Sequence, residues 1–497
     1  MKEDQLNLDA IKALDELIRP AGLNLEDVGG SVSIYGADPL FPSAVRMGEA
    51  FSIAAMAAAI GPAAIWKERT GQGQHLSIDV RKAAHGINPD MTFHPTINGH
   101  PYPDWVGNRH PFGAYPYKTK DGRWVYPSGV YPHQQTKWGN FFNCGTDFEH
   151  IRAAIAKWDA EELEDAANEK GLTLCMVRTT EEWLQHPQGM YLSNEPVIAI
   201  RKIAESAPEP FSPANRPLEG IKVLSLTHAI AGPVVGRTLA EQGADVLCVN
   251  HYDDFEHDWV YYDANVGQRS TFLNLHDPKQ NEICRDLART ADVFVDSFRA
   301  RKMSEFGFSP EELASIRPGI IVVNVRCYGW DGPWSDRGGF DMLGSAVSGL
   351  AILEGKSGTP ALPPTAMLND YITGYIGAAG AAAALLRRAR EGGSYQVTVS
   401  LTRNAMWYPT LGLIPEADRG KNPLMRLCGD LSPHELPELM RELGMLKQHL
   451  LQPDVLIRDT PVGRVRRLAP AVAYATTRSS WREPLLVSRG SCSPEWQ

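Results

Sequence analysis

Two carboxylates stand at corresponding positions in two alanine-rich segments of the chain. Asp370 lies at the front of "MLNDYITGYIGAAGAAAALL", and Glu49 holds the same place in "RMGEAFSIAAMAAAIGPAAIW". A carboxylate at the start of a helix is stabilised by the free backbone N–H groups and by the positive end of the helix dipole. Such a group can cap the helix, or it can attack an electrophilic carbonyl carbon as a nucleophile. The position alone favours capping, and the nucleophilic role is the alternative.

Both acids precede segments that predict long helices packed on several sides, because alanine buries little side-chain entropy and allows close approach. Residues 49–80 align without a gap on residues 370–401, at a constant offset of 321 positions (370 − 49). Each copy continues through a basic turn with glycine into a predicted strand, "QHLSIDV" or "YQVTVSL". The repeat predicts an internal duplication of one supersecondary unit, and chance similarity of two alanine-rich helices is the alternative.

Composition limits the classes of function. A chain of 497 residues with 43% hydrophobic and 22% charged residues predicts a globular protein of more than one structural unit. The formal charge of −10 argues against nucleic acid as a main partner, since phosphate binding needs a basic face. The polar start of the chain lacks a secretory pattern and predicts a cytoplasmic protein. The apolar run at 50–66 contains Gly61-Pro62 and predicts a buried helix rather than a membrane span.

Cysteine and histidine spacing predicts no metal site. The seven cysteines include no C-x-x-C pair, which favours reduced thiols over a zinc site or a disulfide framework. His94, His100 and His110 lie beside turn residues at spacings that fit no compact ligand pattern. We therefore expect these three to be loop histidines.

The clearest α/β pattern begins at residue 218. "IKVLSL" predicts a buried strand, "AGPVVGRTLAEQGA" a helix and "DVLCVN" the next strand, while "ADVFVDSF" and "GIIVVNVRCYG" add two strands around the helical "SPEELASIRP". A doubly wound, Rossmann-like parallel sheet is expected over 218–330. The first turn, "THAIAGPVVG", lacks G-x-G-x-x-G, so a nicotinamide-dependent dehydrogenase is a weaker interpretation.

Five segments are predicted along the chain. They are a partial repeat with an alanine-rich helix (1–90), a small α+β domain with a return segment (91–204), a linker (205–217), a Rossmann-like domain that ends in the Asp370 helix (218–409) and an irregular helical tail (410–497).

Several motifs, in their order along the chain, resemble the family III CoA-transferases, often called the CaiB/BaiF family. The motifs are "PLEGIKVLSLTHAIAGPVVGRTLAEQGADVLCVN", "NVGQRSTFLNLHDP", "GGFDMLGSAVSG" and the Asp370 helix. Residues 216–407 resemble the family continuously, and residues 32–200 resemble the later part of the same domain. The chain thus resembles one and a half copies in rearranged order. The resemblance implies an α/β fold, a Rossmann-like doubly wound sheet with a smaller α+β domain.

The resemblance also implies a reaction. In the transferases of this family, an aspartate at the place of Asp370 is the nucleophile that opens an acyl-CoA thioester. A mixed anhydride and then an aspartyl-CoA thioester carry coenzyme A from an acyl-CoA donor to a carboxylic acid acceptor. For Glu49 we expect a structural or vestigial role, because the extra methylene displaces its carboxylate.

Four arginines fall in the segments that the family places near the CoA phosphates, and arginine binds phosphate as a bidentate fork. The resemblance implies CoA contacts for Arg237, Arg269, Arg299 and Arg301, and ordinary surface charge is the alternative for each. Cys248 stands where the family often has lysine. This difference predicts weaker CoA binding.

The sequence leaves three alternative functions open. The family's racemases carry a histidine where this chain has Phe340, so racemase activity is a weaker interpretation than transfer, with His228 as the substitute base. An inactive paralogue that acts as a binding or assembly partner is a further alternative, and a dehydrogenase is the third. Because family members form interlocked dimers, we expect a homodimer or a pseudo-dimeric monomer.

Overall fold

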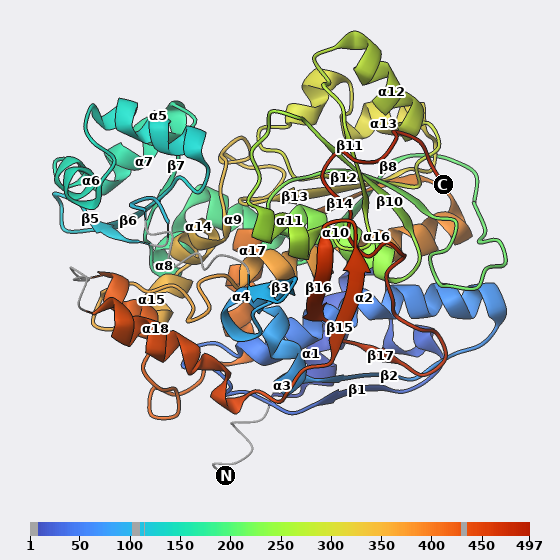
Figure 1. Ribbon diagram of the computed structural model, residues 1–497, viewed down its shortest axis with the longest axis horizontal. Helices are drawn as coiled ribbons and strands as arrows, with labels where there is room; N and C mark the ends of the chain where they lie inside the picture. The colour runs from blue at the N-terminus through green and yellow to red at the C-terminus, as the bar shows by residue number, and fades with distance from the viewer. Residues whose placement is uncertain (1–7, 102–109, 114, 429–434) are drawn as a thin grey trace.

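The computed structural model describes residues 8–101, 110–113, 115–428 and 435–497. Its centre is a seven-stranded sheet in the order β11-β10-β9-β12-β13-β14-β8 (Figure 1). Six strands are parallel, and β8 is antiparallel to β14. The strands are β8 (Ala199–Ala204), β9 (Lys222–Leu226), β10 (Asp245–Asn250), β11 (Arg269–Phe272), β12 (Val293–Asp296), β13 (Ile321–Arg326) and β14 (Ser394–Ser400). This arrangement confirms the predicted Rossmann-like α/β fold.

Helices cover both faces of this sheet, as expected for strands that are buried on both sides. α12 (Pro278–Ala288) and α13 (Pro310–Ile316) pack on Leu224, Phe294 and Val322 of one face. α10 (Ala231–Glu241) and α16 (Asn369–Glu391) lie on the other face, where a Cβ at Gly374 would stand only 2.4 Å from Val234. The small residues of α16 therefore allow the close approach that the sequence predicts.

The two alanine-rich helices pack against each other. α2 (Met47–Thr70) approaches α16 so closely that a Cβ at Gly61 would lie 2.5 Å from the Cβ of Ala382. By length and composition α2 alone among the described helices could cross a membrane, yet its apolar window is entirely buried within the protein. The helix is thus the buried strut that the sequence predicts.

The two copies of the repeat share further geometry. Gly71 directly follows α2 and Gly392 directly follows α16. Both glycines have positive φ, and a strand comes after each. β2 (Leu76–Asp79) pairs in parallel with β1 (Val32–Tyr35), as β14 pairs with β13. The correspondence is consistent with duplication, which stays a prediction.

A smaller domain stands beside the main sheet and contains helices α5, α6 and α7 (Figure 1). Its sheet pairs β5 (Tyr117–Lys118), β6 (Trp124–Ser128) and β7 (Thr173–Met176). Asp121-Gly122 forms the turn of the predicted hairpin, where Gly122 has a φ of +80° that suits glycine. The helices are α5 (Pro132–Phe142), α6 (Phe148–Ile155) and α7 (Ala160–Glu169).

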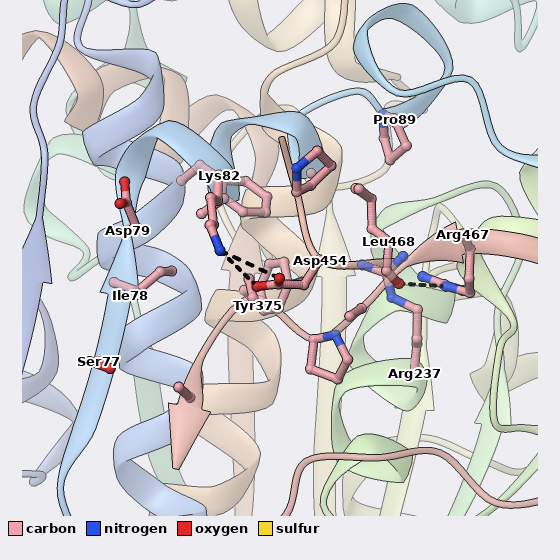
Figure 2. A pocket seen from close by; sticks show the side chains of 18 of the residues that line it. Ser77, Ile78, Asp79, Lys82, Pro89, Arg237, Tyr375, Asp454, Arg467 and Leu468 are labelled. Carbon is pink, nitrogen blue, oxygen red and sulfur yellow. Dashed lines mark hydrogen bonds and ion pairs between the residues drawn. The ribbon is translucent and has the colours of Figure 1, made fainter. Parts of the chain in front are cut away.

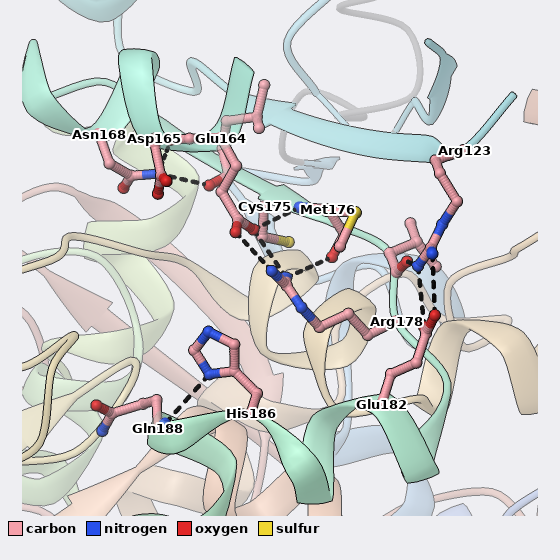
Figure 3. Close-up of polar contacts among 12 residues, drawn as sticks. Arg123, Glu164, Asp165, Asn168, Cys175, Met176, Arg178, Glu182, His186 and Gln188 are labelled. Atoms are coloured by element: carbon pink, nitrogen blue, oxygen red, sulfur yellow. Dashed lines mark hydrogen bonds and ion pairs between the residues drawn. The ribbon is translucent and has the colours of Figure 1, made fainter. Parts of the chain in front are cut away.

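A buried ion pair crosslinks this domain. Glu164 of α7 binds Arg178 at 2.6 Å, and both side chains are at least 95% buried, whereas the nearby pair of Arg123 and Glu182 is well exposed (Figure 3). We expect Glu164→Gln to lower the free energy of unfolding by about 3 kcal/mol, because it strands a buried guanidinium. Glu182→Gln, the matched exposed change, is expected to cost less than about 1 kcal/mol. Urea unfolding of both variants measures the contrast, and equal losses would contradict it.

The C-terminal segment differs from the predicted irregular helical tail. After α18 (Leu436–Gly444), β15 (Val455–Thr460) and β16 (Gly463–Leu468) form a hairpin that joins β3 (Thr96–Ile97). The run "VLIRDTPVGRVRRL" has aliphatic residues on both sides of a turn that includes Pro461 and Gly463, whose φ is +123°. Such a turn between two short segments favours a strand pair, and the helical prediction is wrong for this part.

The remaining described helices and strands are mostly short. They are α1 (Ala10–Ile18), α3 (Val80–Ala83), α4 (Pro89–Thr92), β4 (His100–Pro101), α8 (Thr180–Gln185), α9 (Pro187–Asn194), α11 (Asp258–Ala264), α14 (Asp341–Val347), α15 (Leu350–Glu354), α17 (Leu401–Trp407) and β17 (Ala473–Tyr474), with single turns of 3-10 helix between some of them. The predicted linker, 205–217, joins β8 to β9.

Candidate active site

Asp370 is the second residue of α16, and its half-buried side chain borders two cavities. One cavity, of about 490 Å³, is mainly apolar; the other, of about 510 Å³, lies over the carboxyl ends of the main-sheet strands. We call them the apolar cavity and the polar cavity. Both volumes lie in the range of small-molecule sites.

A second aspartate fixes the start of α16. The buried carboxylate of Asp341, the first residue of α14, accepts the backbone N–H groups of Leu368 at 3.0 Å and Asp370 at 2.9 Å. The Asn369 side chain donates to the same carboxylate at 3.1 Å and to Ser345 at 2.9 Å. Asp341 therefore supplies the cap of this helix, and the carboxylate of Asp370 is left at the two cavities.

The two carboxyl groups influence each other's ionisation. Burial raises the pKa of Asp341 to about 6 in spite of its hydrogen bonds. Burial, together with the negative charge of Asp341, raises the pKa of Asp370 well above its usual range. A carboxylate of raised basicity in a cavity is typical of a functional group rather than of a surface ion pair.

The apolar cavity is lined chiefly by large hydrophobic side chains, with a few polar ones among them. The floor comes from the loops before α14 and α16, and one wall from α18 and the 3-10 turn at Pro423–Cys428. The main lining residues are His110, Tyr115, Trp259, Val260, Leu362, Met367, Leu424, Leu427 and Leu439.

The polar cavity lies at the switch point of the doubly wound sheet, between the carboxyl ends of β9 and β12, where α/β proteins bind their ligands. Cationic and acidic side chains both border it. They are His133, His228, Asp253, Asp254, Glu256, Arg299, Arg326, Asp370 and Arg489.

The two cavities share Tyr131, Pro132, Ala229, Phe340 and Asp370 in their linings. Ala229 follows β9 and has a φ of +60°, an uncommon conformation for a residue with a side chain. Such strain persists only where the surroundings impose it, and it concentrates at functional sites.

The four arginines that the family resemblance places near CoA have different surroundings in the structure. Arg299 lines the polar cavity with Asp370, and its guanidinium also donates to the carbonyl of Gly171 at 2.9 Å. Each of the others binds a carboxylate: Arg301 binds Asp331, Arg269 binds Asp245 and Arg237 binds Asp263, and none is among the described lining residues of either cavity. Their contacts with CoA stay predictions.

Arg237 lies instead in a third cavity, of about 250 Å³, between the N-terminal repeat and the C-terminal hairpin (Figure 2). Arg467 and Tyr375 line the same space, and Lys82 forms an ion pair with Asp454 at its edge. This cavity does not include Asp370 in its described lining.

Several residues of the site are not among the functional candidates predicted from the sequence, and Tyr131, Arg489 and Asp341 illustrate the reasons. Tyr131 comes from the small domain and Arg489 from the C-terminal segment, so only the tertiary fold brings them to Asp370. Asp341 carries a local signal, since it closes the quoted "GGFD" motif before a helix.

Glu49 occupies a site that is closed by an ion pair. Its carboxylate binds Arg46 at 3.0 Å, both side chains are almost fully buried, and burial raises the pKa of Glu49. The backbone N–H of Glu49 donates to Asp38 at 2.8 Å, as that of Asp370 donates to Asp341. The two helix starts are thus built alike, but only Asp370 borders one of the cavities described above.

Within the described ranges, no group of three or more His, Cys, Asp or Glu side chains is arranged to hold a metal ion. His110 lines the apolar cavity, while His94 and His100 lie outside both cavities of the Asp370 site.

The family model described as CoA-transferase family III matches residues 20–203 and 218–423. The chain belongs to CoA-transferase family III. Its two matched segments meet in one sheet, because β8 of the first pairs with β14 of the second. They also meet at the site, where Tyr131 comes from the first and Asp370 from the second.

Known relatives of this family III chain are named as CoA-transferases. The acetyl-coenzyme A transferase nodX of Hypoxylon pulicicidum is 33% identical over 59% of the chain and 53% of that protein. The succinyl-CoA:glutarate CoA-transferase of Homo sapiens is 35% identical over 36% of the chain and 43% of that protein. The chain spans about half the length of the curated relatives it matches.

Among solved structures, a CAIB/BAIF family protein from Brucella suis is 26% identical to the chain. The match covers 39% of this family III chain and 56% of that protein, with a TM-score of 0.35.

Proposed function

We propose that this protein transfers coenzyme A between an acyl-CoA donor and a carboxylic acid acceptor, with Asp370 as the nucleophile. The observation that carries the proposal is the place of Asp370 at the junction of an apolar and a polar cavity. The apolar cavity suits an acyl chain. The polar cavity, with Arg299 and Arg489 at its border, suits the phosphates of coenzyme A.

The first half of the reaction forms an enzyme thioester. A carboxylate oxygen of Asp370 attacks the thioester carbonyl carbon, the C–S bond breaks, and a mixed anhydride and the CoA thiolate result. The thiolate then attacks the aspartyl carbonyl carbon of the anhydride. The C–O bond breaks, the donor acid leaves as a carboxylate, and Asp370 becomes an aspartyl-CoA thioester.

The second half reverses these steps with the acceptor. The acceptor carboxylate attacks the aspartyl carbonyl carbon and releases the CoA thiolate. The thiolate attacks the acceptor carbonyl carbon of the new anhydride, which yields the new acyl-CoA and restores the Asp370 carboxylate. No proton needs to be gained or lost in either half, and thus no separate general base is required.

The chain contributes position and charge stabilisation. Asp341 holds the backbone of Asp370 through its N–H, so that the nucleophile needs little further ordering. The positive end of the α16 helix dipole stabilises the oxyanion of each tetrahedral intermediate. Residues of both matched segments line the site, which supports a pseudo-dimeric monomer. A cytoplasmic location stays a prediction.

Transfer is favoured over racemisation by the residue at position 340. The Phe340 ring lies at the junction of the cavities, 5.9 Å from the ring of Tyr131, and it cannot accept a proton. His228 remains at the border of the polar cavity. Incubation of a chiral 2-methylacyl-CoA in D₂O tests this choice: transfer leaves the α-hydrogen in place, whereas racemisation exchanges it for deuterium.

An oxygen-isotope experiment tests the transfer itself. The protein is incubated with unlabelled acyl-CoA and an acceptor acid whose two carboxylate oxygens are ¹⁸O. Because the acceptor oxygen that bridges the second anhydride stays on the enzyme, the peptide containing Asp370 should gain one ¹⁸O after a turnover. Product formation without label in that peptide would contradict the aspartyl route.

Arg299 offers a prediction about CoA binding. Arg299→Ala is expected to raise KM for acyl-CoA by about tenfold, because it removes a guanidinium from the polar cavity. Arg201 binds Asp331 and lies outside the described lining of both cavities, so Arg201→Ala is the matched control, for which we expect less than a twofold change. Initial rates at varied acyl-CoA give both values, and equal effects would contradict the assignment of Arg299.

The raised carboxyl pKa values predict opposite effects of pH on activity and stability. The attacking group must be ionised, so kcat/KM should still rise with pH above the ordinary range of an aspartate, because the pKa of Asp370 is raised. The folded pKa of Asp341 exceeds its ordinary value of 3.8, so its contribution to stability is present below pH 4 and is lost as the pH rises through about 6. Rates and urea unfolding from pH 4 to 8 measure both trends; a rate that falls over pH 5 to 7 would contradict the prediction.

A further inference from the structure

A carboxylate of the protein itself occupies hydrogen-bond donors beside Asp370. Glu256 accepts the backbone N–H of Ala229 at 2.7 Å on one oxygen and the Tyr131 hydroxyl at 3.2 Å on the other. Both donors belong to residues that border the two cavities together with Asp370. The carboxylate of Glu256 thus binds at the point where the apolar and polar cavities meet.

The donors lie next to regular elements of the fold, whereas Glu256 lies in a connection without regular structure. Ala229 lies three residues after the end of β9, and Tyr131 immediately precedes α5. Glu256 lies in the connection 251–257 between β10 and α11, which carries two large exposed side chains, Tyr252 at 62% and Phe255 at 50%. Besides the two donors, Glu256 accepts the N–H of His257 within its own connection.

Among the described contacts, no cationic side chain forms an ion pair with the Glu256 carboxylate. Its hydrogen-bond partners are neutral groups, and Asp253, Asp254 and Asp370 border the same cavity. His228 has its Nδ1 at 3.4 Å from the Tyr131 oxygen. The site therefore binds one carboxylate through directed hydrogen bonds rather than through a salt bridge.

We propose that the Ala229 N–H and the Tyr131 O–H form the binding site for the carboxylate of the acceptor acid, and that Glu256 occupies this site in the free protein. The inference rests on the proposed function, because an acceptor carboxylate must be held near the aspartyl-CoA carbonyl before it attacks. The strained φ of +60° at Ala229 directs an N–H to this place. Movement of the 251–257 connection exposes the two donors.

The consequence is competition between Glu256 and the acceptor. The apparent affinity for a carboxylate is reduced by the fraction of molecules in which Glu256 occupies the donors. Removal of the Glu256 carboxylate should therefore strengthen acceptor binding, whereas removal of a residue that merely supports the loop should weaken it.

The test measures binding of ¹³C-acetate by NMR titration in the absence of coenzyme A. Glu256→Ala is expected to lower the Kd for acetate by about tenfold, since the internal competitor is gone. Asp253→Ala removes one negative charge from the border of the same cavity and is expected to change the Kd by less than about twofold. The double variant Glu256→Ala with Tyr131→Phe should lose most of the gain, because one donor is missing.

An unchanged or higher Kd in the folded Glu256→Ala protein would overturn the inference, and so would an equal gain in Asp253→Ala. If Glu256→Ala does not fold, Glu256→Gln is titrated instead, with the same direction expected, since the amide oxygen can accept from only one of the two donors and carries no charge. Failure of the proposed function shows separately: it leaves Asp370 without a covalent adduct whatever the acetate affinity.

Discussion

Asp370→Asn is expected to reduce CoA transfer by at least about 10⁴-fold, with little loss of acyl-CoA binding. The amide cannot attack a thioester, and removal of a nucleophile that forms a covalent intermediate has effects of this size or larger. The backbone N–H of residue 370 still donates to Asp341, so the helix start should remain intact. Turnover of several CoA esters and a binding titration with CoA measure the two quantities.

The repeat supplies a matched control for this change. Glu49→Gln makes the same substitution of charge by amide at the start of the corresponding helix, α2, where Arg46 is the partner. We expect this variant to lose stability, because Arg46 is left buried without its carboxylate. Its kcat per folded molecule should match that of the unaltered protein. A comparable loss of turnover in both variants would show that the chemistry does not belong to Asp370 alone.

Asp341→Asn is expected to lower kcat by about 100-fold although Asp341 is not the attacking group. The N–H groups of Leu368 and Asp370 share one oxygen of Asp341, and the Asn369 amide donates to the other. In the asparagine variant a neutral oxygen replaces the charged acceptor, and its amide nitrogen cannot accept from Asn369. The start of α16 then shifts, and a displacement of about 1 Å at a reacting group costs about this factor. The pH profile should move to lower pH, because the charge that raises the pKa of Asp370 is gone.

Asp38→Asn is the matched control for Asp341. Asp38 accepts the backbone N–H of Glu49 at 2.8 Å, and burial raises its pKa to about 6, as for Asp341. Both variants should lose stability, but only Asp341→Asn should lose turnover per folded molecule and shift the pH profile. If the pH profile of Asp341→Asn stays in place, the two carboxyl groups are not coupled as described.

The main sheet could be predicted from the sequence because its signals are local. The strands at 222–226, 245–250, 293–296 and 321–326 are short apolar runs bounded by turn residues, and α10 and α13 lie between them as predicted. β11 carries no local strand signal, because "RSTF" is short and polar, and its place beside β10 is set by tertiary pairing. The β15–β16 hairpin carries only a turn signal at Pro461 and Gly463, because its strands lack a regular alternation of apolar and polar residues.

The candidate site was predictable only in part. Asp370 stands out through the repeat and the family motif, both of which are visible in the chain. Tyr131 and Arg489 reach the site from segments more than 100 residues away in sequence, and no local pattern marks them. Arg237 and Arg269 were selected from family segments, yet each lies in a buried ion pair, which sequence alone does not show because the partner is also distant.

The most direct test of the account is a search for a covalent adduct on Asp370. The protein is incubated with an acyl-CoA in the absence of an acceptor acid, quenched in acid and digested, and the peptides are weighed by mass spectrometry. We expect the peptide containing Asp370 to carry coenzyme A as a thioester, and we expect hydroxylamine to convert this thioester to the hydroxamate. A protein that exchanges coenzyme A between acids while this peptide stays unmodified, or while the adduct lies on another residue, would contradict this expectation.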